Sequence, residues 1–155
     1  LRLGQVVDGG TALEFDQPWE GPFTNYATVI AHGGRYRLYY RGVATAGADG
    51  RDAEVTCVAE SGDGVRFERP AVGLHNERGR NVVLAGDAPL QHNFSPLVDR
   101  DGTYKALAGT KKSGLVAFHS EDGVKWRKLQ AAPVLTEGDF DSQNVAFWSA
   151  AEGQY

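Results

Sequence analysis

The chain of 155 residues contains no methionine, a single cysteine and no long apolar segment. Because Met is absent, Leu1 is not an untouched translation start, and we expect the sequence to be a piece of a longer parent protein. Cys57 alone excludes an internal disulfide and zinc sites built from several cysteines, and we expect it to lie buried on a strand. Apolar runs such as residues 26–31 are far shorter than the roughly 20 residues that span a bilayer, and no signal-peptide pattern opens the chain. We therefore expect a soluble chain with no membrane partner, and export of the parent protein stays open.

Basic residues are also few. The chain has 16 Lys and Arg against 20 Asp and Glu, a formal net charge of −4, and no basic cluster larger than a pair such as Lys111-Lys112. Nucleic-acid binding needs a basic face that displaces counterions from phosphates, so we expect no nucleic-acid partner. With 41% hydrophobic and 23% charged residues, the composition is that of a globular chain able to bury a core.

The strongest pattern in the sequence is an internal repeat. Residues 61–67 and 120–126 share the pattern Ser-x-Asp-Gly-Val-(Arg/Lys)-aromatic at an offset of 59 residues (120 − 61). Each copy follows an apolar run, residues 55–60 or 115–119, and each precedes a proline, Pro70 or Pro133. Repetition of this kind indicates stacked copies of one supersecondary unit.

Each repeat is preceded by a predicted β-hairpin. Residues 29–36 turn at Gly33-Gly34 and residues 97–104 turn at Asp101-Gly102, dipeptides that supply the positive φ angles of tight turns. A third hairpin of the same kind begins at residues 147–155. After the first turn, residues 36, 38 and 40 are apolar or aromatic and alternate with arginines, which predicts a strand packed on one face. Helical periodicity is absent, and 20 Gly and 6 Pro favour many short strands.

These elements predict an all-β fold built from four-stranded antiparallel blades, as in a β-propeller. We assign residues 1–23 to a lead-in segment, 24–91 to a first blade, 92–140 to a second and 141–155 to the start of a third. A β-sandwich is the rival architecture, but it does not account for the repeated turn.

The sequence resembles the five-bladed β-propeller glycoside hydrolases, the group that contains β-fructosidases (family 32), arabinanases and xylosidases (family 43), and their bacterial relatives. The resemblance rests on residues 25–30, 35–42, 59–64, 92–96, 104–109 and 140–144, and covers nearly the whole chain. The Asn-Asp-Pro-Asn and Arg-Asp-Pro signatures of the fructosidases are absent. The repeated turns are also similar to shortened sialidase Asp boxes, which implies that Asp63 and Asp122 stabilise blades and do no chemistry.

The resemblance implies a partial five-bladed β-propeller of about two and a half blades, from a parent enzyme that hydrolyses O-glycosyl bonds in a carbohydrate substrate. A piece of this length cannot close the ring. We expect it to be inactive alone and to self-associate through unpaired blade edges. The alternatives are a non-catalytic carbohydrate-binding propeller and a purely structural one.

The first strand of each propeller blade lines the central channel, so residues at the starts of these strands face one funnel. Substrate-binding residues are therefore expected at the three strand starts, namely Asn25, Tyr26, His92, Asn93, Gln143 and Asn144. Two further candidates are Trp19 and Arg41. For the Asn residues, shaping of the opening turn is an equal alternative. For Arg41, an internal ion pair is favoured over a substrate carboxylate.

Glycoside cleavage requires two carboxyl groups, one to protonate the leaving oxygen and one to activate water or attack the sugar. Asp141 is the first candidate, because it precedes the third blade and is flanked by aromatic residues that can stack on a sugar ring. Asp16 and Glu20, on either side of Trp19, are candidates for its partner. The alternative for all three is a solvated loop carboxylate or a turn cap.

The four histidines, His32, His75, His92 and His119, lack the spacing of a helical metal site. We therefore predict no metal ligands and no cofactor, with a structural calcium in the channel left open.

Overall fold

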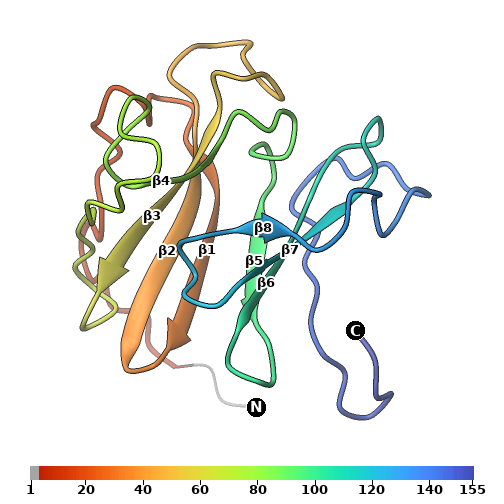
Figure 1. Cartoon of the computed structure of the whole chain (residues 1–155). Helices are drawn as coiled ribbons and strands as arrows, with labels where there is room; N and C mark the ends of the chain where they lie inside the picture. Colours follow the sequence, from red (N-terminus) through yellow and green to blue (C-terminus); the bar gives the residue numbers. More distant parts are fainter. Residues whose placement is uncertain (1–3) are drawn as a thin grey trace.

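The computed structural model describes residues 4–155, which form two four-stranded antiparallel sheets (Figure 1). The first sheet contains β1 (Asn25–His32), β2 (Arg35–Gly42), β3 (Val55–Ser61) and β4 (Val82–Ala85) in that order. The second contains β5 (Ser95–Val98), β6 (Tyr104–Ala108), β7 (Val116–Ser120) and β8 (Arg127–Lys128). Residues 4–155 contain no helix, so the all-β prediction is confirmed.

Both predicted hairpins are present. Strands β1 and β2 pair from His32 opposite Arg35, across Gly33 and Gly34, whose φ angles are 60° and 74°. Only glycine adopts this left-handed region readily at two successive residues, which fixes a tight turn here. Strands β5 and β6 pair from Val98 opposite Tyr104 across a five-residue loop.

The repeated sequence gives a repeated turn structure. In the first copy, Asp63 accepts hydrogen bonds from the backbone N–H groups of residues 65 and 66 and from the Ser61 hydroxyl, at 2.8–2.9 Å. In the second copy, Asp122 accepts the equivalent bonds from residues 124 and 125 and from Ser120, at 2.8–3.0 Å. The two aspartates are therefore structural, as expected from the turn pattern.

Strand β2 differs from the prediction because both of its faces are buried. Tyr40, on one face, belongs to the core of the first sheet, which contains Leu38, Tyr40, Val55, Cys57, Ala59, Phe67 and Val82. Tyr39, on the other face, is 0% exposed and packs with Ile30, Val58, Val83 and Tyr104. Of the alternating arginines, Arg37 thus faces the second sheet, where it donates to the carbonyl of Asp122, whereas Arg35 is exposed. The buried position of Cys57 is as predicted.

The two sheets pack through this second face of β2. The rings of Tyr39 and Trp126 meet edge to face with centroids 6.0 Å apart, and the Tyr39 hydroxyl donates to the carbonyl of Gly123 at 2.8 Å. Strand β1 contacts β5, so the first strands of the two sheets lie side by side (Figure 1). This arrangement brings the start of each first strand to one region.

Segments before and after the strands cover the remaining faces. Leu13 and Trp19 pack against the core of the first sheet, and the Phe15 ring lies 4.7 Å from that of Tyr40. On the second sheet, Lys105 donates to the Tyr155 hydroxyl at 2.7 Å. Residues 141–155 contain no strand, and the third predicted hairpin is reduced to a single bridge between Ser149 and Gln154.

Candidate functional site

The start of β1 is irregular at two of the predicted binding residues. The register of β1 shifts between Asn25 and Thr28, and Tyr26 has a positive φ of 53°, which is unusual for a residue with a side chain. Asn25 accepts a hydrogen bond from the Tyr26 N–H at 2.8 Å and is exposed. Asn25 thus supports the irregular start of β1, and its role in substrate binding stays a prediction.

Two side-chain amides join the segment after the second sheet to the first strands. Gln143 donates to the carbonyl of Tyr26 at 3.1 Å and to the Thr28 hydroxyl at 2.8 Å. Asn93, fully buried, donates to the carbonyls of Phe140 and Ser142 at 3.2 and 2.9 Å. Phe140 also has a positive φ, 49°. The predicted residues Asn93 and Gln143 thus hold together the three places from which the site was expected to form.

Arg41 lies at the centre of an ionic cluster in which Glu54 is buried and Asp49 is exposed. Its Nη1 is 3.0 Å from Asp49 Oδ1, 3.4 Å from Glu54 Oε1 and 3.0 Å from His92 Nδ1. Its guanidinium stacks over the Tyr26 ring at 4.8 Å, and the Tyr26 ring meets His92 edge to face at 5.4 Å. The internal ion pair predicted for Arg41 is therefore present.

The ligand atoms of Asp49, Glu54 and His92 lie within 4.8 Å of one another, a spacing that would suit a bound metal ion. Here the guanidinium of Arg41 supplies that positive charge. The possibility of a channel calcium stays a prediction.

Asp141 and His92 share a cavity of about 550 Å³. Its other lining residues are Thr110, Lys111, Lys112, Asp139 and Phe140. Asp141 is exposed, whereas Lys111 pairs with Asp139 at 2.5 Å. Asn144 is next to this region and donates to the carbonyl of Ser142 at 2.8 Å. We call the space between His92 and Asp141 the His92–Asp141 pocket.

The structure does not bring Asp16, Glu20 and Trp19 to this pocket. Glu20 is fully buried and pairs with Arg69 Nε at 2.7 Å, which raises the pKa of Arg69. Asp16 pairs with the same arginine at 3.1 Å, and a hydrogen bond from Gln17 lowers the pKa of Asp16. Trp19 donates from Nε1 to Asn81 at 3.0 Å in the interior of the first sheet. These three residues cover one face of the first sheet and are not part of the candidate site.

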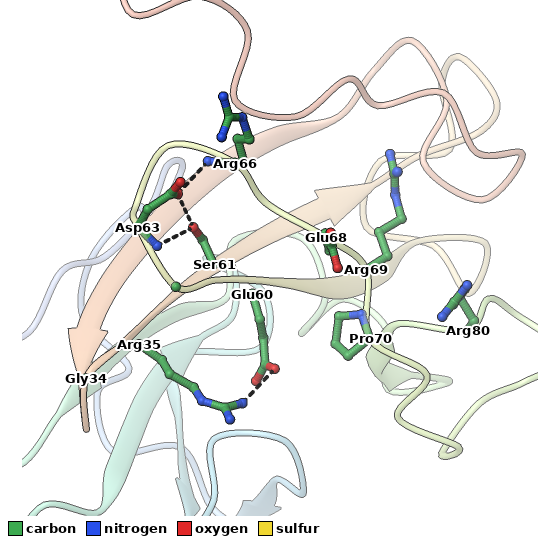
Figure 2. A pocket seen from close by; sticks show the side chains of 11 residues that line it. Gly34, Arg35, Glu60, Ser61, Asp63, Arg66, Glu68, Arg69, Pro70 and Arg80 are labelled. Carbon is green, nitrogen blue, oxygen red and sulfur yellow. Dashed lines mark hydrogen bonds and ion pairs between the residues drawn. The ribbon is translucent and has the colours of Figure 1, made fainter.

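A larger cavity of about 740 Å³ lies at the edge of the first sheet, beside the first repeated turn (Figure 2). Four of its seven charged side chains bond within the protein, namely Arg35, Glu60, Asp63 and Arg69. Asp63 accepts a hydrogen bond from the Ser61 hydroxyl, and Arg35 forms an ion pair with Glu60 at 3.7 Å (Figure 2). Arg69 is held by Glu20. The cavity contains none of the predicted site residues, and we place the candidate site at the His92–Asp141 pocket.

Asp49 and Glu54 are not among the site residues predicted from the sequence. Both lie in the loop between β2 and β3, where no repeated pattern occurs. One signal was present, because Asp49-Gly50 is a turn dipeptide and Glu54 directly precedes a strand of buried residues. An acid directly before a strand of buried residues is a candidate for a buried ion pair.

Comparisons with known proteins give structural matches only. No protein-family model and no curated protein matches the chain. The structure of the Cellvibrio cellulosa α-L-arabinanase complexed with arabinohexaose aligns with a TM-score of 0.54 and 14% identity, over 81% of this chain and 42% of that one. Another structure of this arabinanase gives 0.52 and 15%, over 84% and 47%. An exo-1,5-α-L-arabinanase from a bovine ruminal metagenomic library gives 0.50 and 13%, over 75% and 40%.

The chain has the fold of part of an arabinanase β-propeller. The predicted partial five-bladed propeller is therefore confirmed. The chain spans less than half the length of these arabinanases, and identities of 13–15% establish the fold alone. Among the described residues, no helix has the length and hydropathy needed to cross a membrane.

Proposed function

We propose that the chain contributes the carbohydrate site of a glycoside hydrolase-like protein, and that the site is the His92–Asp141 pocket. The observation that carries this proposal is the meeting of His92 and Asp141 in one cavity beside the first strands of a propeller fold that arabinanases share. Sugars present hydroxyl groups of fixed direction, which suits polar side chains on rigid strands next to aromatic rings. Tyr26 and Phe140 supply such rings. The Gln143 amide donates to the carbonyl of Tyr26, and the Asn93 amide donates to the carbonyl of Phe140.

In this proposal Asp141 is the ionised carboxylate that activates water or attacks the sugar. It is exposed to the pocket solvent. Arg41 has a supporting role, because it is buried and its charge is shared by Asp49 and Glu54. Asn93 and Gln143 position the backbone around the pocket through the bonds given above.

The test is binding and turnover with arabino-, xylo- and fructo-oligosaccharides. Calorimetry on the 155-residue chain measures binding, and chromatography of the products measures hydrolysis by the longest natural protein that contains the chain. We expect Asp141→Asn to lower turnover by about 100-fold or more. The matched control is Asp52→Asn, which changes an exposed aspartate whose carboxylate forms no hydrogen bond or ion pair among the described residues. Equal turnover of the wild type and Asp141→Asn would remove Asp141 from the mechanism.

A second candidate, a carbohydrate-binding propeller without catalysis, is favoured by one observation. The other carboxylate of the pocket, Asp139, is paired with Lys111, and the predicted partners Asp16 and Glu20 are paired with Arg69. Binding of an oligosaccharide with no product from any of the three substrate classes would support this second function.

A further inference from the structure

The second sheet has an open apolar cavity on its outer face, the face opposite to Tyr104. The cavity has a volume of about 310 Å³ and is lined on the strands by Leu97, Lys105, Leu107 and Ala117. Leu135, which follows β8, also lines it and is 51% exposed. Contiguous exposed apolar surface of this kind marks a contact with another element or another protein.

This face corresponds to the face of the first sheet that packs against the second sheet. The serines of the two repeated turns give the alignment, because Ser61 is opposite Tyr36 and Ser120 is opposite Tyr104. Followed along the strands, the pairing makes Leu97, Lys105, Leu107 and Ala117 the equivalents of Ile30, Arg37, Tyr39 and Val58. Three of these equivalents, Ile30, Tyr39 and Val58, form the core between the two sheets. The cavity therefore lies where a second interface between sheets is expected.

The segment after β8 begins a hairpin of the repeated kind beside this face (Figure 1). Residues 153–155, Gly-Gln-Tyr, repeat the order of residues 102–104, Gly-Thr-Tyr. The N–H of Ser149 donates to the carbonyl of residue 154 at 2.8 Å, just as the N–H of Asp99 donates to that of residue 103 at 2.8 Å. Tyr155 is therefore the equivalent of Tyr104 in the next repeat.

Tyr155 also makes the contact that Tyr104 makes in the first interface. Lys105 Nζ lies 4.5 Å from the centre of the Tyr155 ring, and the guanidinium carbon of Arg37, the equivalent of Lys105, lies 5.4 Å from the centre of the Tyr104 ring. The second interface is thus partly built by residues of this chain.

The first interface contains one further ring, that of Trp126 from the second Asp-Gly turn. This ring meets Tyr39 and Tyr104 edge to face, with centroids 6.0 and 6.3 Å apart. The equivalents of these two tyrosines, Leu107 and Tyr155, both line the open cavity. The cavity therefore lies where an equivalent of Trp126 would pack.

We propose that this cavity is the docking surface for a further antiparallel sheet of the parent protein, which inserts the aromatic side chain of a third Asp-Gly turn between Leu107 and Tyr155. In the first interface Arg37 donates to the carbonyl of Asp122, and its equivalent Lys105 offers a donor to the third turn. The occupant is a continuation of this chain rather than a second copy, because the hairpin that ends in Tyr155 already leads onto the face. The arabinanases of the same fold support a further sheet, since this chain covers 42–47% of their length.

The first test is the sequence of the longest natural protein that contains the chain. The two known turns are 59 residues apart (120 − 61), and in each the aromatic residue is the third after the glycine. We expect a third Ser-x-Asp-Gly turn at a similar distance beyond Ser120, with an aromatic residue at the same place. A natural protein without such a turn beyond residue 155 would overturn the proposal.

A thiol in the cavity tests whether the face is covered. Leu107→Cys introduces this thiol, whereas the native Cys57 is buried. We expect Ellman's reagent to label the variant in the 155-residue chain, and to label it about 100-fold or more slowly in the longer protein, where labelling requires local opening. The matched control is Leu74→Cys in the loop between β3 and β4, which should react at the same rate in both proteins. If Leu107→Cys does not fold, Ala117→Cys places a thiol in the same cavity.

Other occupants give different labelling patterns. A thiol that is protected in the 155-residue chain at high concentration and labelled on dilution would show that a second copy covers the cavity. Protection at every concentration would show that the segment after β8 covers it alone. Equal labelling in the chain and in the longer protein would show that nothing docks there. Each of these three results would overturn the proposal.

The inserted ring is tested in the longer protein that carries Leu107→Cys. We expect replacement of the aromatic residue of the third turn by alanine to speed labelling of the introduced thiol by about 10-fold or more, because loss of a buried ring weakens the packing around it. Unchanged protection in this double variant would overturn the insertion of that ring.

Discussion

The two copies of the Asp-Gly turn have the same internal structure but different neighbours. In each, a tyrosine ring lies beneath the glycine, Tyr36 below Gly64 and Tyr104 below Gly123. The first turn lines an open cavity at the edge of its sheet (Figure 2). The second is held against the first sheet, where Arg37 donates to the carbonyl of Asp122 and Tyr39 to that of Gly123. The motif therefore determines the structure of the turn itself. Whether the turn also joins two sheets depends on whether another sheet packs against it.

The two sheets differ again in how their outer faces are covered. The lead-in segment covers the first sheet with a buried ion pair, Glu20 with Arg69, to which the Tyr40 hydroxyl also donates. The segment after the second sheet is held by more exposed contacts, such as Lys105 with Tyr155 and Arg100 over the Trp148 ring at 3.7 Å. We expect the first cover to matter more for stability than the second.

The largest expected effect is on the cover of the first sheet. Glu20→Ala leaves Arg69 partly buried without its main partner, and we expect a loss of about 3–5 kcal/mol in the free energy of unfolding, measured by urea denaturation. Lys105→Ala, which breaks a more exposed ion pair with Asp99, should cost about 1 kcal/mol or less. Similar losses in the two variants would break the distinction between the covers.

A second prediction compares the glycines of the two turns. Gly64 and Gly123 have φ angles of 75° and 71°, so alanine costs about 1–2 kcal/mol at either. A Cβ at Gly123 would also lie 2.7 Å from the buried Tyr39 hydroxyl oxygen, whereas one at Gly64 would meet only the Tyr36 ring at 3.2 Å. We expect Gly123→Ala to cost about 3 kcal/mol, because overpacking adds about 1–3 kcal/mol there. Equal urea midpoints for the two variants would contradict the contact between sheets.

How much of this arrangement the sequence predicts depends on whether the interaction is local. The Asp63 and Asp122 turns and the Gly33-Gly34 hairpin follow from neighbouring residues, and all were predictable. The partner of Glu20 is 49 residues away, and that of His92 is 38 residues away. No repeat or spacing marks Arg69 or Glu54, so the sequence placed Glu20 in a catalytic pair and left Glu54 out. Alternation in β2 likewise showed a strand but not that the second sheet covers Arg37.

A third prediction concerns the hydroxyl that joins the sheets. Tyr39→Phe removes the donor to the Gly123 carbonyl, and we expect a loss of about 0.5–1.5 kcal/mol. Tyr36→Phe is the matched control on the same strand, because the Tyr36 hydroxyl makes no hydrogen bond within residues 4–155, and its effect should stay within about 0.5 kcal/mol. A loss of the same size in both variants would show that ring packing, and not this bond, carries the difference.

The smallest expected effect is the pH dependence of the turns. Backbone hydrogen bonds from Arg66 and Val65 lower the pKa of Asp63 to about 2. At Asp122, burial opposes the change, but bonds from Lys125 and Val124 still lower the pKa. An unfolded aspartate titrates near 3.9, so each turn stabilises the fold fully above that pH and loses its contribution as pH falls through the folded pKa. We expect the urea midpoint to fall between about pH 4 and pH 2, and to fall less in Asp63→Asn and Asp122→Asn.

Because only the second turn contacts the first sheet, protonation of Asp122 should also change the fluorescence of Trp126, whereas Asp63→Asn should leave that change intact. A carboxyl signal of Asp63 that titrates near 3.9 would contradict the turn geometry itself.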